Sequence, residues 1–454
     1  MKKNIKVINI VHCVDTEGPL NETLKATFDR IFSLYNLKIQ PTKKNLIDIL
    51  NQNKKFKKIG KLISKTFNKR LLTYLDSFSK INKMLNNIES KKYRNSIKDD
   101  FGNGWIFNWF CMDHVNFKSN PRKRVIGYHK IFDFYINRVQ NLNQCKKDAI
   151  HFHFHPHSIS NHAHHSGTHW WSHNNSLYQI LSRRIIDRMW FPCSNRPGFH
   201  VIRPESHWFL EQFIPFDFSN QSNKNYQDDL LQSDVNNFRF GNWNKAPQTW
   251  TPYHPDHNDY QKKGKCNRII VRCLNVGTRH NLLKQTDVDQ AFKEAKKGNK
   301  VLLAFTNHDF REMKDDIEQV KNYLDKSKKK YGDVLVKYCE AASAVRDVMK
   351  LDKRPACKFK IFFKNNLLTI STKEPTFGPQ PFFTIKDIFG KYHHDNLNFI
   401  ESNHEWNYVF DENTIPLKYV ESVGIASNNK VGVTTVTKWN NKNKKTVSKI
   451  WNQY

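Results

Sequence analysis

Histidine and phenylalanine alternate in the segment Ala149–Gly167, which reads AIHFHFHPHSISNHAHHSG. A period of two is typical of a β-strand, because successive side chains point to opposite faces. We therefore expect a strand whose phenylalanines face a hydrophobic core and whose histidines face a cavity. Since neutral imidazole is the commonest metal ligand, the pattern predicts a metal site. A solvated histidine tract or an affinity tag is the alternative, but a tag lies at a terminus and does not interleave phenylalanine.

Short apolar runs alternate with helical segments over residues 148–350, which predicts a parallel α/β architecture. Two of the runs are AIHFHFH (149–155) and HVIRP (200–204), and NRIIVRCLNV and KVLLAFTNHD follow further along the chain. Helices are expected over 287–299 and 310–332, where the apolar residues recur at helical spacing.

The chain of 454 residues divides into segments of different pattern. We expect an α/β domain over 1–350, which opens with a strand within 1–20 and contains a mostly helical insertion at 21–147. From about residue 355 the pattern changes to short strands, two of them around the Asn-Asn turn of KFKIFFKNNLLTIST. Residues 355–454 are therefore expected to form an all-β domain.

The net charge of +32 and the cysteine pattern restrict the partners and the compartment. Strong positive charge favours a nucleic acid, an anionic membrane surface or a phosphate-bearing substrate. The alternative is a compositional bias, since the lysines are spread along the chain. Eight cysteines without a CxxC pair argue against a zinc ribbon or a disulfide scaffold and favour a reducing compartment. With no signal peptide and no 18-residue apolar run, we expect a cytoplasmic protein with at most peripheral membrane contact.

Two carboxylates follow the first expected strand in the sequence HCVDTEGP. Asp15 and Glu17 are two residues apart, so both project from one face at the C-terminal end of that strand, where parallel barrels build active sites. Two carboxylates on one face repel each other unless a cation or a proton lies between them. A turn with helix-capping acids is the alternative interpretation.

Two other apolar runs end in functional groups. Arg203 ends HVIRP, where its guanidinium can bind a carboxylate in a bidentate manner. His308 and Asp309 end KVLLAFTNHD just before a helix, and a histidine beside an aspartate is a ready acid–base pair. With Asp15, Glu17 and the histidine strand, these residues form a specific set, each at a strand terminus.

In this order, the motifs resemble those of the polysaccharide deacetylases, the NodB-homology group of carbohydrate esterase family 4. The resemblance covers about residues 5–20 and 148–330 and implies a distorted (β/α)7 barrel. In VDTEGP it implies that Asp15 is the catalytic base and Glu17 a metal ligand, with Glu in place of the usual Asp.

The family's second motif is a pair of histidines four residues apart. Both His153 with His157 and His151 with His155 satisfy this spacing. We favour His153 and His157 as the metal ligands, with His155 as a further candidate.

The later motifs of the family supply an arginine and a general-acid histidine. Arg203 matches the arginine, without the Pro-Gly that often follows it. His308 resembles the general acid, and its neighbour Asp309 is included among the catalytic candidates.

The resemblance implies a metal-dependent deacetylase that hydrolyses an N-acetyl or related acyl group of a sugar in surface-polysaccharide (lipopolysaccharide) biosynthesis. Zn²⁺ is the expected metal, held by Glu17 and two histidines. Asp15 takes the proton of the attacking water, Arg203 orients Asp15, and His308 protonates the departing amine. In a cytoplasmic enzyme the expected substrate is a nucleotide- or lipid-linked acetylated sugar, whose phosphates also suit the positive charge.

Two other functions remain open from the residues themselves. A phosphoesterase on a similar barrel would use a two-metal site built from His12, His151 and Asp309. A nucleic-acid-binding protein would need a clustered basic surface with stacking aromatics. The aromatic patch at 104–117 contains few cations, which makes nucleic acid the least favoured partner.

Overall fold

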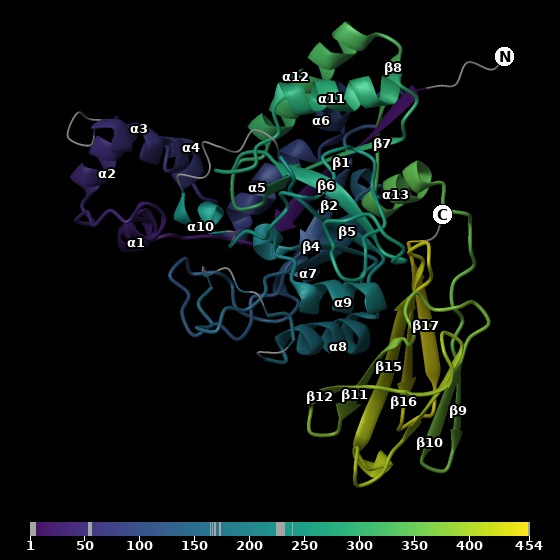
Figure 1. Ribbon diagram of the computed structural model, residues 1–454. Coiled ribbons are helices and arrows are strands. Elements are labelled where there is room, and N and C mark those ends of the chain that lie inside the picture. Colours follow the sequence, from purple (N-terminus) through teal and green to yellow (C-terminus); the bar gives the residue numbers. More distant parts are fainter. Residues whose placement is uncertain are drawn as a thin grey trace, which may run out of the picture.

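In the computed structural model of the chain, strand β1 (Lys6–Thr16) pairs with β2, β7 and β8 in a parallel sheet that closes on itself (Figure 1). Seven strands follow one another in the order β2-β3-β4-β5-β6-β7-β1, and β1 pairs with β2 to close the barrel. An eighth strand, β8 (Val334–Tyr338), pairs with the N-terminal half of β1. The other barrel strands are β2 (Phe107–Cys111), β3 (Ala149–Phe154), β4 (Ser194–Pro197), β5 (Phe216–Asn220), β6 (Ile269–Asn275) and β7 (Val301–His308).

The structure describes residues 6–52, 57–163, 165, 167, 169–171, 174–223, 232–237 and 239–452. Residues 164 and 166 of the histidine-rich segment therefore lie outside the described residues. The helices of the α/β part are α1 (Leu24–Tyr35), α2 (Lys43–Leu50), α3 (Lys57–Thr66), α4 (Lys69–Leu72), α5 (Phe78–Ile88), α6 (Lys91–Ser96), α7 (Lys130–Asn141), α8 (Ser176–Arg188), α9 (Pro204–Phe213), α10 (Ser233–Asn236), α11 (Gln285–Lys296), α12 (Lys314–Tyr331) and α13 (Ala341–Met349).

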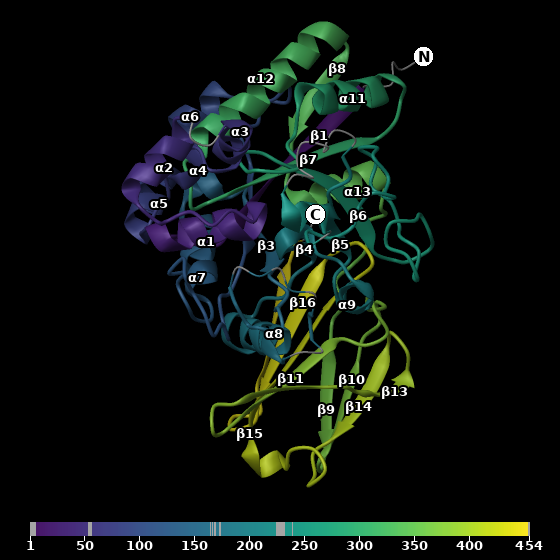
Figure 2. The same ribbon diagram turned by 60° about the vertical axis from the view of Figure 1, so that its left-hand side comes forward.

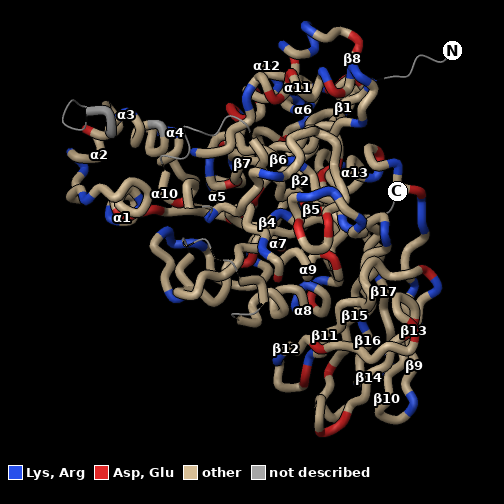
Figure 3. Tube along the Cα trace, in the orientation of Figure 1, with Lys and Arg blue, Asp and Glu red and all other residues tan. Residues whose placement is uncertain are grey.

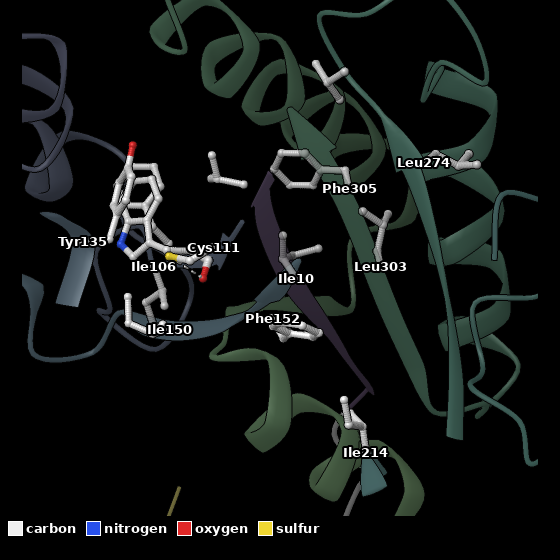
Figure 4. Close-up of a cluster of buried hydrophobic side chains, with 14 of the residues drawn as sticks. Ile10, Ile106, Cys111, Tyr135, Ile150, Phe152, Ile214, Leu274, Leu303 and Phe305 are labelled. Atoms are coloured by element: carbon white, nitrogen blue, oxygen red, sulfur yellow. Dashed lines mark hydrogen bonds between the residues drawn. The ribbon is translucent and has the colours of Figure 1, made fainter. Parts of the chain in front are cut away.

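The barrel strands are buried on both faces, which explains the nearly continuous apolar sequences of strands such as β6 and β7. One face of β1, with Val11 and Cys13, packs inside the barrel with Phe110, Phe218 and Cys273. Helix α13 packs against this inner cluster. The opposite faces form a larger outer core beneath the surrounding helices, part of which Figure 4 shows around Ile10, Phe152, Leu303 and Phe305. The expected parallel α/β barrel is thus confirmed at the level of its architecture.

The segment 21–147 was expected to be a mostly helical insertion. It forms α1 to α7, but it also contains β2, the second strand of the barrel. The sequence FNWFC of β2 is buried at every position, so it lacks the alternation that marks a half-buried strand. Figures 1 and 2 show α1 to α4 on one side of the barrel, away from the C-terminal strands, whereas α5 packs on the barrel core.

The fourth barrel strand is not the expected run HVIRP. Residues 198–200 form a 3₁₀ turn, and Arg203 is the N-cap of α9, whose first residue is Pro204. The strand is instead β4, with the sequence SNRP, which is fully buried by its pairing with β3 and β5. Polar side chains and a proline conceal this short strand in the sequence.

The C-terminal part is an antiparallel all-β unit, as expected. Strands β9 and β10 pair around the predicted Asn-Asn turn. One sheet has the order β13-β14-β10-β9, the other β12-β11-β15-β16-β17, and they enclose a common core that includes Trp406 and Trp439. The strands are β9 (Lys360–Lys364), β10 (Leu367–Ser371), β11 (Phe382–Asp387), β12 (Tyr392–Asp395), β13 (Asn398–Glu401), β14 (Glu405–Val409), β15 (Val420–Asn428), β16 (Thr434–Asn440) and β17 (Thr446–Trp451).

The C-terminal unit is attached to the barrel through buried polar contacts as well as apolar ones. Helix α8 packs against β11, β12 and β15. The Asn428 amide donates to the carbonyls of Pro192 and Phe213, both at 2.8 Å. These bonds satisfy backbone groups that the interface would otherwise leave buried without partners.

The basic residues are distributed over the whole trace rather than gathered in one segment (Figure 3). Among the described residues, no helix combines the length and the apolar character that a membrane span requires.

Candidate functional site

A cavity of about 650 Å³ opens at the C-terminal ends of the barrel strands. Asp15 and Glu17 reach it from the end of β1, His153 and His155 from the end of β3, and His308 from the end of β7. The strand register explains this convergence, because Asp15 pairs with His308 across β1 and β7. Five of the residues singled out in the sequence therefore line one cavity.

Glu17, His153 and His155 form a group with metal-ligand geometry. Each offers one ligand atom, and these atoms lie within 4.8 Å of one another. The Nε2 atoms of His153 and His155 are 3.0 Å apart, and Nε2 of His155 is 3.5 Å from Glu17 Oε1. One carboxylate and two imidazoles are a common donor set for Zn²⁺ that leaves open positions for water and substrate.

The tautomer of His153 suits a ligand. Its Nδ1 donates to the carbonyl oxygen of Arg196 at 2.6 Å, so Nε2 carries the lone pair that faces His155. Metal-binding histidines typically donate their other ring N–H in this way, which fixes the ring orientation. Burial lowers the pKa of His153 to about 4, so the ring is neutral near pH 7. The residues present thus fit a divalent metal ion.

Asp15 is held by an arginine that the sequence analysis missed. Nε of Arg196 donates to Asp15 Oδ1 at 2.7 Å, and both side chains are buried. Burial by itself raises the pKa of Asp15, but Arg196, with His153 and His308, outweighs it and lowers this pKa below the usual value. Among the described residues no hydrogen-bond donor is recorded for Oδ2, which lies 4.0 Å from Nε2 of His308. The Asp15 carboxylate is therefore ionised, fixed at one oxygen and open at the other.

Glu17 is fixed through both its side chain and its backbone. Oε2 forms a buried ion pair with Arg124, and His114 Nε2 donates to the Glu17 carbonyl at 2.9 Å. The N–H groups of Glu17 and Gly18 donate to Asp309 at 2.9 and 3.0 Å. Burial raises the pKa of Glu17, but Arg124 and His155 hold it well below the usual value. Glu17 is thus an ionised and rigidly placed ligand candidate.

His308 lies beside both carboxylates. Its Nε2 is 3.6 Å from Glu17 Oε1 and 4.0 Å from Asp15 Oδ2. Burial lowers its pKa to about 3, despite the two carboxylates that raise it. The structure thus places His308 where the sequence analysis expected a proton-transferring group.

His157 does not join the cavity group. It is buried, and its ring stacks on Phe117 at 5.3 Å and lies 5.9 Å from Phe154. Strand β3 ends at Phe154 and Pro156 follows, so the strand alternation does not continue to position 157. The preferred pair His153 and His157 is therefore not brought together, whereas His153 and His155 are.

Arg203 does not hold Asp15. It caps α9, and its guanidinium donates to the carbonyl of Ile202 at 3.0 Å. The Pro-Gly pair that the sequence analysis looked for after the arginine follows Arg196, in SNRPGF. This pair was the available signal for Arg196.

Position 198 accepts only glycine, for a steric reason. A Cβ at this position would overlap the imidazole of His155. The short turn after β4 therefore passes directly beneath a ligand candidate.

Asp309 is not among the residues that line the cavity, and its carboxylate accepts hydrogen bonds from the backbone. Besides the N–H groups of residues 17 and 18, it accepts from the Tyr135 hydroxyl at 2.9 Å. Burial raises its pKa to about 7. This bonding makes it a positioning residue for the β1 end rather than a partner of His308 in proton transfer.

The structure gives little support to a two-metal phosphoesterase site, because His12, His151 and Asp309 each bind other partners. His12 lies between Trp105 and Asn307, both at 2.9 Å, and stacks on Phe305. His151 contacts Glu340 at 3.3 Å and is not among the cavity-lining residues.

Comparison of the chain with protein-family models, with curated proteins and with solved structures finds no match. The functional argument therefore rests on the geometry of this cavity.

Proposed function

We propose that the protein is a metal-dependent hydrolase that removes an acyl group, most simply N-acetyl, from a sugar. The observation that carries the proposal is the combination of two carboxylates with different roles on one strand end. Glu17 lies with two imidazoles, whereas Asp15 is bound to Arg196 and keeps one oxygen open. The resemblance to polysaccharide deacetylases assigns the same division of roles to a DxE strand end.

Glu17, His153 and His155 would hold a zinc-class ion, which when bound acidifies water and polarises the acyl carbonyl. Asp15 accepts the proton of the attacking water at Oδ2. Arg196 keeps this carboxylate ionised and oriented. His308, on the adjacent strand end, starts neutral and transfers to the departing sugar amine the proton that Asp15 has taken from water.

The wall of the cavity supports a substrate that carries phosphate. Arg30, Arg122 and Arg311 all line it, and the Glu22 carboxylate lies between the first two. Glu22 accepts from Arg30 at 2.7 Å and from Arg122 at 3.1 Å. Arg311 donates to the Leu71 carbonyl at 3.2 Å and also hydrogen-bonds to the Tyr74 side chain, but it forms no ion pair within the described part of the chain. Even when Asp29 is counted with Glu22, the three guanidinium groups leave this wall with an excess of positive charge.

The cavity as a whole repeats this imbalance. Its lining includes eight Lys and Arg side chains against four Asp and Glu side chains. Arginine is well suited to phosphate, because its planar fork forms paired hydrogen bonds. A nucleotide-linked or lipid-linked acetylated sugar combines such a phosphate with an acyl group. We therefore place the sugar at the histidines and the phosphate at the arginines.

The experiment is metal analysis of the purified protein combined with an acetate-release screen over N-acetylated sugars, each offered free and as its nucleoside-diphosphate derivative. We expect acetate release that requires a divalent ion, with the diphosphate derivative preferred. His153→Ala should abolish turnover, whereas the matched control His393→Ala, on the C-terminal sheet, should not change it.

The outcomes separate the two parts of the proposal. Metal-dependent acetate release without preference for the diphosphate derivative would remove the phosphate assignment alone. Turnover that survives both His153→Ala and removal of metal would contradict the hydrolase mechanism.

A further inference from the structure

A second group of metal-ligating side chains lies outside the cavity, on α9 and the segment 251–266. His207 and Glu211 are one turn apart on α9, and Cys266 ends the segment. One ligand atom from each lies within 4.8 Å of the other two. The thiol of Cys266 is in hydrogen-bonding contact with Glu211 Oε1, and the His207 ring lies 4.0 Å from the same oxygen. His207 Nε2 donates to the Asp256 carbonyl at 2.9 Å, so the lone pair available to a metal is on Nδ1, which is buried and has no hydrogen-bond partner among the described residues.

A fourth donor lies on the solvent side of this group. Nδ1 of His257 is 2.8 Å from Glu211 Oε2, and its side chain is 65% exposed. Two imidazoles and one thiol therefore surround the carboxylate of Glu211. Two of these donors come from a helix at i, i+4 spacing and two from a loop, a mixture typical of small structural zinc sites.

Cys266 differs from the other cysteines in its exposure to solvent. The other seven cysteines are buried, whereas Cys266 is partly exposed. A thiol next to three other donors is the feature that separates a zinc ligand from a cysteine that only fills a core.

A second carboxylate–thiol cluster outside the cavity has different electrostatic surroundings. Glu89, Cys145 and Asp148 also lie within ligand distance of one another. Arg94 forms two hydrogen bonds to Asp148, and Arg138 pairs with Glu89, so arginines already balance both carboxylates. No such ion pair to Glu211 is formed by a Lys or Arg of the described chain, so its charge is balanced only by donors that can themselves bind metal.

The loop that carries His257 and Cys266 has a defined fold. Gly264 approaches the Asp256 backbone so closely that a Cβ would overlap it. His254 Nδ1 donates to the Cys266 carbonyl at 2.8 Å, which fixes the end of the loop. A metal bridge to α9 would tie this loop to the barrel, as structural zinc does in small domains.

We propose that His207, Glu211, His257 and Cys266 form a structural zinc site, separate from the cavity. Zinc binding replaces the proton on the Cys266 sulfur with a Zn–S bond and releases that proton to solvent; the other three ligands donate lone pairs. No oxidant or further reactant is required. The role of the ion here is to fasten the loop.

Cobalt substitution tests this proposal without reference to activity. Thiolate-to-cobalt charge transfer gives a near-ultraviolet absorption band, and the cavity group contains no thiol. Metal-free protein reconstituted with Co²⁺ should therefore show the band, and Cys266→Ser should lose it. Glu17→Gln should retain the band, because it alters only the cavity group.

Zinc counting and a milder variant complete the test. The wild-type chain should bind one more zinc equivalent than Cys266→Ser, and Cys357→Ser is the matched control for loss of a thiol elsewhere. His257→Ala changes an exposed side chain and should fold, with zinc affinity at this site reduced at least about tenfold. Absence of the band in the Co²⁺-loaded wild type, or equal zinc content in wild type and Cys266→Ser, would overturn the proposal.

Discussion

The two histidine groups of this protein are built from similar side chains but differ in their surroundings. In the cavity, arginines bind the carboxylates: Arg196 pairs with Asp15 and Arg124 with Glu17. At α9, no Lys or Arg of the described residues pairs with Glu211, whose neighbours are His257 and a thiol. The cavity group faces an open volume, whereas the α9 group joins a helix to a loop.

This difference indicates what each group does. Arginine-bound carboxylates stay ionised and fixed while water and substrate exchange, which suits catalysis. A group without such support, closed by four protein donors, suits a permanently bound ion. Ligand type alone does not separate the two functions, but the charges around the ligands do.

The largest expected effect compares the same substitution in the two groups. His153→Ala should reduce hydrolysis at least about 10³-fold, because loss of the ion removes several kcal/mol of transition-state stabilisation. His207→Ala should leave the turnover of the folded protein within about threefold while lowering its thermal stability in zinc. Steady-state rates and thermal unfolding of both variants check this. Equal rate losses in both variants would contradict the assignment of a catalytic role to the cavity group and a structural role to the α9 group.

The second comparison concerns the two aspartates close to Glu17. Asp15→Asn keeps the side-chain size but removes the base, so metal should remain bound while hydrolysis falls about 10²–10⁴-fold. Asp309→Asn should mainly affect stability, by roughly 1–3 kcal/mol, because one of three buried donors loses its acceptor. Metal content, rates and urea unfolding distinguish them. An Asp15→Asn enzyme with the parent rate would contradict the assigned base.

How far the sequence predicts the cavity can be judged from individual residues. Asp15, Glu17, His153, His155 and His308 could be found, because each lies at the end of a strand with a clear apolar or alternating pattern. The carboxyl ends of parallel strands meet at one end of a barrel, so the order of motifs was sufficient to bring these side chains together.

What the sequence did not reveal has specific physical causes. Arg196 lies in β4, whose residues SNRP are polar but buried by strands on both sides, so no apolar run marks it. His157 was favoured by spacing alone, yet Pro156 ends the alternation before it. The α9 group joins residues about 60 apart in sequence, and only the folded loop places Cys266 against Glu211.

The third comparison separates two arginines by what they contact. Arg196→Lys should reduce hydrolysis about 10–100-fold, because an ammonium group cannot hold Asp15, the Phe218 carbonyl and the His200 ring together. Arg203→Lys should change the rate little, since this residue caps α9, its guanidinium donates to the Ile202 carbonyl, and it is not among the residues that line the cavity. Steady-state rates of the two variants show which arginine orients Asp15. A larger loss in Arg203→Lys would restore the original assignment.

The last comparison tests whether arginine support makes the cavity wall sensitive to acid. Burial raises the pKa of Glu22, but Arg30 and Arg122 outweigh it and lower this pKa to about 2. Because the folded-state pKa lies below the unfolded value of 4.5, the ionised carboxylate stabilises the fold above pH 4.5. That contribution, roughly 3 kcal/mol from the size of the shift, is lost as the pH falls toward 2. Glu22→Gln should therefore be less stable than the wild type at pH 7, with a difference that shrinks between pH 4.5 and 2.

Urea unfolding of both proteins at several pH values measures this difference directly. Asp333→Asn is the matched control, because Asp333 pairs with Lys6 on the surface, where water screens the ion pair. A Glu22→Gln difference that stays constant with pH would mean that the arginines do not control the Glu22 charge. The excess positive charge assigned to the phosphate-binding wall would then lose its support, while the assignment of Glu17, His153 and His155 would stand, because it depends on separate contacts.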